Sequence, residues 1–154
     1  DNTQIFGGTF GMRGNLNDTW FARGSVTYTK GKELDTNTPL SSIPPLFGVV
    51  EVGFEKEQFQ AYINWKFNGK KPIDDYNLVE GIDNEGQTPF NSITGNYYGS
   101  PSWSTFNISS NYKLSNALTC YLNIDNILDV HYKEFASSIS APGRNVSVSL
   151  LLNI

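Results

Sequence analysis

The stretch LNIDNILDVHYKEFASSISAPGRNVSVSLLLNI, residues 122–154, decides the fold of this chain. Its last ten residues alternate between an apolar parity and a polar parity, and Leu151 is the one apolar residue on the polar side. The apolar parity consists of Val146, Val148, Leu150, Leu152 and Ile154. A period of two predicts a β-strand with one apolar and one polar face. The sequence Ala-Pro-Gly-Arg at 141–144 is typical of a turn, because proline fixes φ and glycine tolerates positive φ.

The same alternation occurs six more times upstream, so the sequence predicts an all-β chain of seven strands. The clearest case is 58–67, where Phe59, Ala61, Ile63, Trp65 and Phe67 alternate with polar residues. The predicted strands are 3–14, 19–30, 47–55, 58–67, 103–114, 117–132 and 145–154.

The connections between these strands alternate in length. Short turns follow the first, third and fifth strands, and longer segments follow the others, at 31–46, 68–102 and 133–143. In an antiparallel up-and-down sheet, all short turns then lie at one end and all long loops at the other. This asymmetry is typical of transmembrane β-barrels, which have short periplasmic turns and long extracellular loops.

Composition fits this interpretation and excludes several others. The chain is 14% aromatic and only 17% charged, and it contains 14 glycines, which suits a protein rich in strands and turns. No apolar run is as long as a transmembrane helix, but barrel strands are half polar and leave no such signal. The net charge of −4 argues against a nucleic-acid partner, and the single cysteine, Cys120, excludes an internal disulfide framework.

Aromatic spacing helps to decide which way the apolar parity faces. Trp20 and Tyr28 are eight residues apart, as are Phe59 and Phe67, all on the apolar parity. Eight residues of strand span roughly 27 Å, or roughly 21 Å across a membrane when tilted by about 40°, near the ~25 Å apolar band of outer-membrane barrels. The spacing favours an outward apolar face, although core aromatics of a soluble β-sandwich remain an alternative.

Two motifs near the end of the chain carry a resemblance to a known family. Asn126-Ile127-Leu128-Asp129-Val130-His131-Tyr132 followed by Ala-Pro-Gly-Arg-Asn at 141–145 resembles the C-terminal end of TonB-dependent outer-membrane receptors. There, an Asn-Leu-Phe-Asp-x-x-Tyr motif leads through the same turn into the final barrel strand. The segment PLSSIPPLFG at 39–48, with Tyr-Thr-Lys-Gly at 28–31 before it, is similar to a segment preceding a late strand in such receptors.

The resemblance implies that residues 1–154 are the C-terminal part of a receptor β-barrel. It implies the last seven of twenty-two strands, in the bacterial outer membrane, with the plug domain outside this chain. Seven strands cannot close a conventional barrel, which also indicates a segment of a larger one. The chain lacks an initiator Met and a signal peptide, so we expect a processed product or a fragment.

The function implied is active uptake of a scarce nutrient such as an iron chelate, haem, cobalamin or a glycan. The implied partners are outer-membrane lipid, the remainder of the barrel, the plug, a small nutrient ligand and, indirectly through the plug, TonB. No catalysis, cofactor or nucleic-acid partner is expected. Two alternatives stay open: a passive porin or adhesin-type barrel fragment, which would lack a plug, and a soluble β-barrel ligand carrier, which would dissolve without detergent.

Four aromatic residues in or beside the 68–102 loop are candidate ligand contacts: Tyr76, Tyr97, Tyr98 and Trp103. Aromatic rings there can stack on a ligand or belong to the upper aromatic girdle of the barrel, and the sequence favours neither. A loop of this length inside a compact domain indicates a function.

No metal or catalytic site is expected. A calcium site is one interpretation of Asp74, Asp75, Glu80, Asp83 and Glu85, but their spacing matches no EF-hand loop, which favours a solvated acidic loop. His131 is the only histidine and has no second nitrogen or sulfur ligand beside it. Cys120 shares the apolar parity of Leu118 and Leu122, which predicts a small lipid-facing side chain.

Overall fold

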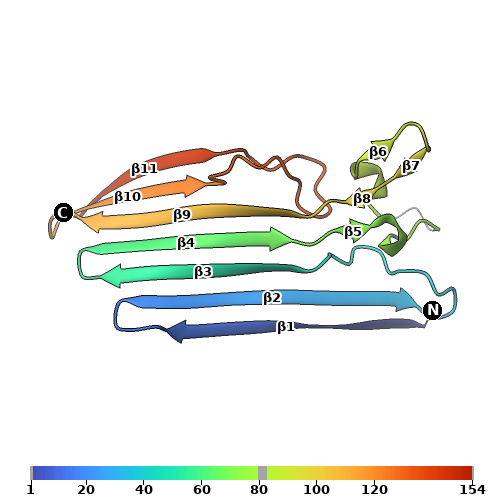
Figure 1. The fold of residues 1–154 in the computed structure, drawn as a ribbon, viewed down its shortest axis with the longest axis horizontal. Helices are drawn as coiled ribbons and strands as arrows, with labels where there is room; N and C mark the ends of the chain where they lie inside the picture. The colour runs from blue at the N-terminus through green and yellow to red at the C-terminus, as the bar shows by residue number, and fades with distance from the viewer. Residues whose placement is uncertain (1, 80–82, 154) are drawn as a thin grey trace.

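The chain forms one antiparallel sheet of seven strands, whose neighbours in space are also neighbours along the chain. A computed structural model describes residues 2–79 and 83–153 (Figure 1). The sheet strands are β1 (Thr3–Asn15), β2 (Trp20–Glu33), β3 (Phe47–Lys56), β4 (Phe59–Asn68), β9 (Trp103–Lys113), β10 (Leu118–Asp125) and β11 (Asn145–Leu152). The prediction of seven up-and-down strands is confirmed. The predicted outward position of Ile154 and the loop residue Glu80 lie outside the described residues.

The two ends of the sheet differ as the connection lengths predicted. The short turns after β1, β3 and β9 lie at the end that holds the C-terminus (Figure 1). The three long connections lie toward the opposite end, which is also the end that holds the N-terminus. They are called below the first long loop (34–46), the second long loop (69–102) and the third long loop (126–144).

Strand register places the apolar parities of all seven strands on one face. One row of partners runs Ala22, Val52, Ile63, Ile108, Ile124 and Val146 across six strands. Side chains on this face stay open: Phe10 and Met12 are each 69% exposed, and Val148 is 65% exposed. A sheet with one continuous apolar face needs an apolar environment against that face.

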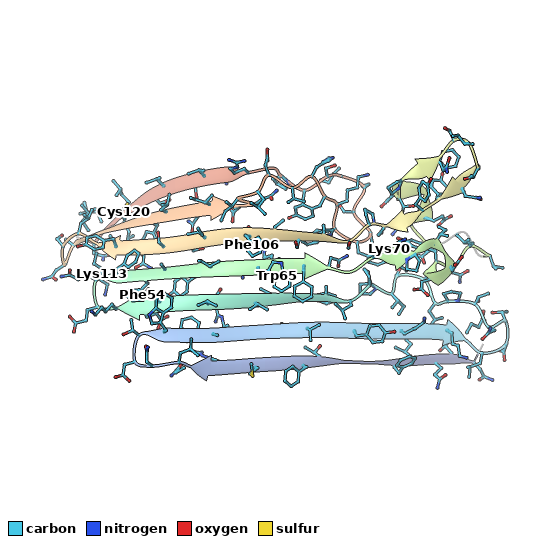
Figure 2. The ribbon with its side chains drawn as sticks, viewed as in Figure 1. Phe54, Trp65, Lys70, Phe106, Lys113 and Cys120 are labelled. Carbon is cyan, nitrogen blue, oxygen red and sulfur yellow. The ribbon has the colours of Figure 1, made fainter. Side chains whose placement is uncertain are left out.

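Aromatic side chains on the apolar face gather at two levels. At the short-turn level, Trp20 packs on Phe54, Phe54 on Phe59 and Phe59 on Tyr112, with ring centroids 5.0, 5.9 and 6.4 Å apart. Nearer the long loops, Trp65 packs on Phe67 and on Phe106 at 4.5 and 6.3 Å. Figure 2 shows Phe54 near the short-turn end, with Trp65 and Phe106 further toward the long loops. Two aromatic levels are the pattern of a membrane-spanning wall.

The polar face carries hydrogen bonds between strands. Arg23 of β2 and Glu51 of β3 form an ion pair at 2.7 Å. Between β4 and β9, the Asn107 Nδ2 donates to Asn64 Oδ1 at 3.3 Å, and Asn111 Nδ2 donates to Gln60 Oε1 at 3.0 Å. Cross-strand amide and ionic pairs satisfy one another, so this face can stand in a polar lumen.

The sixth strand is shorter than the sequence predicted. Alternation suggested 117–132, but β10 ends at Asp125. The next residue, Asn126, has φ 49, and Asp129 has φ 55, and such left-handed backbone cannot continue a strand. The Asn126 side chain fixes this bend: its Nδ2 donates to Val130 O and its Oδ1 accepts from Val130 N, each at 2.9 Å. Its Nδ2 also reaches the carbonyl of Pro142 at 3.3 Å.

The two sequence motifs near the end of the chain contact each other. Asp129 Oδ1 accepts the backbone N–H of Arg144 at 2.7 Å, which ties the first motif to the turn before β11. A Cβ at Gly143 would lie 2.7 Å from the same oxygen, so any larger residue must displace Asp129. The motif residues therefore build the bend that leads into the last strand.

The second long loop contains short structured pieces, which the sequence did not predict. Two small ladders pair β5 (Lys71–Pro72) with β8 (Gly99–Ser100), and β6 (Phe90–Asn91) with β7 (Asn96–Tyr97). Two single 3-10 turns, η1 (Ile73–Asp75) and η2 (Glu85–Gln87), lie between them. Among residues 2–79 and 83–153, no helix is long and apolar enough to cross a membrane.

The sheet has almost no hydrophobic core of its own. Phe21 and Tyr76 are the only buried hydrophobic side chains among the described residues. Phe21 lies on the polar face between Arg13 and Arg23, whose guanidinium carbons are 5.5 and 5.8 Å from its ring centroid. A soluble domain of this size buries far more apolar surface, so the fold of this chain depends on what surrounds it.

Candidate functional site at the long-loop end

The four predicted aromatic residues lie at the long-loop end of the sheet, but the structure does not bring them into one cluster. Tyr76 is buried, with 3% of its surface exposed, and its hydroxyl is 2.6 Å from Ser100 Oγ. Tyr97 packs on Phe90 at 5.0 Å within the small β6–β7 hairpin. Tyr98 is 56% exposed, and its hydroxyl accepts the Asn91 amide at 2.5 Å. Contact of these residues with a ligand stays a prediction.

Trp103, the fourth of them, belongs to a contact between the second and third long loops. It begins β9 and packs on Tyr132 of the third long loop, with ring centroids 4.2 Å apart. Among the described residues, its buried indole N–H has no hydrogen-bond partner. Burial raises the pKa of Tyr132, with Glu134 and Asp125 adding to the effect. Tyr132 is therefore a neutral phenol that packs as an aromatic ring.

A cavity of about 330 Å³ separates these two loops. Tyr76, Asn84 and Thr88 line it from the second long loop. The third long loop contributes Tyr132 and Glu134 among others. Aromatic rings with hydroxyl, amide and carboxylate groups give a wall that can bind a polar ligand of small size.

The sequence missed the most buried charges among residues 2–79 and 83–153, which lie beside this cavity. Lys71 Nζ and Asp83 Oδ2 form an ion pair at 3.4 Å, with side chains only 4% and 0% exposed. Burial lowers the pKa of Lys71, and the neighbouring Asp83 carboxylate opposes that shift. The prediction of a solvated acidic loop is wrong for Asp83, because the second long loop folds back and encloses it.

No local signal in the sequence could have identified this pair. Lys71 and Asp83 are twelve residues apart in a segment without periodicity, and their burial depends on two other loops. Lys71 Nζ lies 4.2 Å from the ring centroid of Tyr76 and 4.7 Å from that of Phe135, which belongs to the third long loop.

The alternatives involving metal ions gain no support from side-chain geometry. Within residues 2–79 and 83–153, no group of three or more His, Cys, Asp or Glu side chains could hold a metal ion. His131 is exposed, and its Nε2 lies 3.5 Å from Ser140 Oγ. Cys120 is half-buried on the apolar face, opposite Leu150 and Tyr112. Figure 2 shows Cys120 and Lys113 near the short turns, and Lys70 at the long-loop end.

Comparison with known proteins agrees with this geometry. The sequence matches the family described as TonB dependent receptor-like, beta-barrel, over residues 1–127. Among curated proteins, no sequence matches this chain.

Three solved structures share the fold and extend well beyond this chain. The copper transporter OprC has 20% identity and a TM-score of 0.75, over 97% of this chain and 23% of that one. The ferripyoverdine receptor of Pseudomonas aeruginosa bound to ferripyoverdine has 14% identity and a TM-score of 0.70, over 97% and 19%. The FpvAI–pyocin S2 complex has 14% identity and a TM-score of 0.68, over 97% of this chain and 20% of that one.

The family match covers most of the chain, and the structural matches cover nearly all of it, although this chain spans less than a quarter of each matched protein. Proteins of this family are receptors and transporters of the bacterial outer membrane, and they are not enzymes. The chain belongs to the TonB-dependent receptor β-barrel family, as a seven-stranded transmembrane segment of a barrel in the bacterial outer membrane.

Proposed function

We propose that residues 1–154 are the C-terminal part of the β-barrel of an outer-membrane active transporter, with the plug domain outside this chain. The observation that carries the proposal is the combination of one exposed apolar face over all seven strands with three long loops at a single end. Such a sheet is a membrane wall with a recognition surface at its outer edge.

Within that transporter, this chain supplies structure and recognition. The apolar face contacts lipid, and the polar face, with the Arg23–Glu51 pair and the Asn64–Asn107 amides, lines the lumen toward the plug. TonB acts on the chain only indirectly, through the plug. The chain carries no catalysis, and its contribution to transport is to hold a ligand at the outer face.

The ligand is a scarce nutrient such as an iron chelate, haem, cobalamin or a glycan. The matched proteins bear the names of a copper transporter and of a ferripyoverdine receptor, which agrees with a metal or a metal chelate. The ligand-contact candidates of this chain are Tyr76, Tyr97, Tyr98 and Trp103. The exposed ring of Tyr98 supports this role, since it offers an aromatic face that a ligand can use.

A passive porin or adhesin-type barrel would have the same membrane-spanning sheet, but passage of solutes through it would need no energy. A soluble ligand carrier would turn its apolar face inward, around a core that this chain does not build. The plug and the requirement for TonB separate the first alternative from active transport.

The test uses the complete receptor in its bacterial host. Cells with and without the receptor, and with and without TonB, are offered labelled iron chelates, haem, cobalamin and oligosaccharides. We expect accumulation of one ligand class that requires both proteins and stops when a protonophore dissipates the inner-membrane gradient. Receptor-dependent entry of many small solutes without TonB would identify a passive pore.

A further inference from the structure

The Lys71–Asp83 pair connects all three long loops. Asp83 Oδ1 accepts the backbone N–H of Ser42, in the first long loop, at 3.3 Å, and that of Asn84 at 3.2 Å. Its Oδ2 accepts the N–H of Asn77 at 3.1 Å and the Lys71 ammonium at 3.4 Å. A carboxylate that accepts four donors is fully satisfied although it is buried.

The third long loop joins this pair through an aromatic ring. The Lys71 ammonium lies between Tyr76 and Phe135, at 4.2 and 4.7 Å from their ring centroids. A cation between two aromatic faces is attracted to both, and more strongly where water is excluded. Phe135 stands between Glu134 and Ala136, which line the cavity of about 330 Å³, and Tyr76 lines its opposite wall.

We propose that Lys71 and Asp83 are positioning residues that fix the three long loops to one another and so set the width of the cavity between the second and third. Removing either charge leaves the other buried without its counter-ion, which destabilises the surrounding loops. Removing both charges together leaves no such imbalance. The proposal needs only the fold of this chain, and it holds even where the nutrient binds elsewhere in the receptor.

A second ion pair in the same region serves as a matched control. Lys30 of β2 and Asp75 of η1 also join two elements, at 3.5 Å, but their side chains are 55% and 42% exposed. Exposed pairs contribute little to stability because water solvates each partner alone. Loss of the Lys30–Asp75 pair should leave the loops in place.

The experiment measures distances between spin labels in the complete receptor. Cys120 and any cysteine elsewhere in the receptor are replaced by alanine. Labels are then placed at Gln87 and Ser138, exposed positions of the second and third long loops, and in a second sample at Leu34 and Gln87. We expect narrow distance distributions in the parent protein, and distributions about twofold wider in Lys71→Met and in Asp83→Asn.

The double variant Lys71→Met/Asp83→Asn distinguishes the effect of an unpaired buried charge from the effect of changing either side chain. Its distributions should be narrower than those of either single variant, and Lys30→Met should match the parent protein. Unchanged widths in both single variants would overturn the proposal, as would a double variant at least as wide as the wider single. Resistance of the folded barrel to detergent at room temperature confirms assembly of each variant.

Amide hydrogen exchange in the unsubstituted receptor keeps the proposal testable where a variant fails to assemble. The backbone amides of Ser42, Asn77 and Asn84 should exchange as slowly as sheet amides, although the Ser42 residue is exposed. Exchange of all three at the rate of open loop amides would overturn the proposal, because the carboxylate of Asp83 would not be holding them.

Discussion

The sheet and the long-loop end of this molecule both expose large apolar side chains, but the long-loop end also buries a pair of charges. On the sheet, large apolar side chains such as Phe10 and Leu150 are exposed. At the long-loop end, Lys71 and Asp83 are buried, whereas Ile93 and Ile139 are 93% and 76% exposed. The sheet has one apolar and one polar face, and we propose that it is organised by what surrounds it, lipid on the first and lumen on the second. The loops are organised by contacts among themselves, so a charge can be more buried than an isoleucine.

Removal of the second long loop is expected to have the largest effect on function and little effect on the sheet. Asn68 and Trp103 are register partners at the ends of β4 and β9, so a short Gly-Ser connection can replace residues 69–102 without moving either strand. We expect the complete receptor to lose uptake of its nutrient while the barrel still assembles. The measurements are uptake by intact cells and heat-modifiable migration of the barrel.

The matched control for that replacement is the turn at 16–19, which joins β1 and β2 at the other end of the sheet. A Gly-Ser connection there should leave uptake intact. Uptake that survives loss of 69–102 would place the ligand contacts elsewhere in the receptor.

Single arginines should distinguish the two faces of the sheet. Ile63→Arg and Val148→Arg put a charge on the apolar face near mid-strand and should destabilise the barrel by about 2–4 kcal/mol. Ser147→Arg, one residue from Val148 and on the polar face, should cost much less. Denaturant unfolding of the complete receptor in lipid vesicles measures both, and equal costs would mean that the faces are assigned the wrong way round.

Loss of the bend after β10 should destabilise the barrel by less than an arginine on the apolar face does. Asn126→Ala removes the bonds to both backbone groups of Val130 and leaves these half-buried groups without that partner, which costs about 1–3 kcal/mol. Asn116→Ala, in the exposed turn before β10, should change stability by less than about 0.5 kcal/mol. Thermal unfolding of the two variants in the same lipid tests the difference, and similar losses would show that the bend is held by other contacts.

The smallest expected effect is on the titration of Tyr76. Burial raises its pKa above the ordinary value of 10.0, although the hydrogen bond with Ser100 opposes the shift. A raised pKa means that the folded state favours the neutral phenol. The stability from that phenol is complete below about pH 10 and is lost as the pH rises through the folded pKa. Phenolate absorbance of the parent receptor minus that of Tyr76→Phe should have its midpoint above 10.0, and a midpoint at or below 10.0 would contradict the burial.

The sequence predicted the sheet well because strand alternation is a local property. Phe59 to Phe67 alternate whether or not their neighbours are known, so the strands, their faces and the two ends of the sheet follow from residues read in order. The error at β10 has a local cause as well, since the alternation continues past Asp125 while Asn126 adopts a left-handed backbone.

The candidate site was only partly predictable because its contacts cross three loops. Alternation and loop length indicated the end of the sheet at which the candidate ligand contacts lie, and Tyr98 and Trp103 are at that end, but their contact with a ligand stays a prediction. The burial of Asp83 depends on Ser42, forty-one residues earlier, and the position of Lys71 depends on Phe135. Contacts at such separations cannot be predicted from composition or periodicity. They form because the topology places the three loops at one end of the sheet.

The hydrogen bond between Asp129 and the backbone of Arg144 has a consequence for how positions 129 and 143 evolve. The two motifs are separated along the chain, yet one carboxylate joins them, and the space beside it admits only a glycine at 143 without displacement. A lineage that loses Asp129 gains freedom at 143, and one that acquires a larger residue at 143 has less reason to keep Asp129. The two positions should therefore change together among descendants. The arginine at 144 is not constrained by this bond, because it contributes only its backbone N–H.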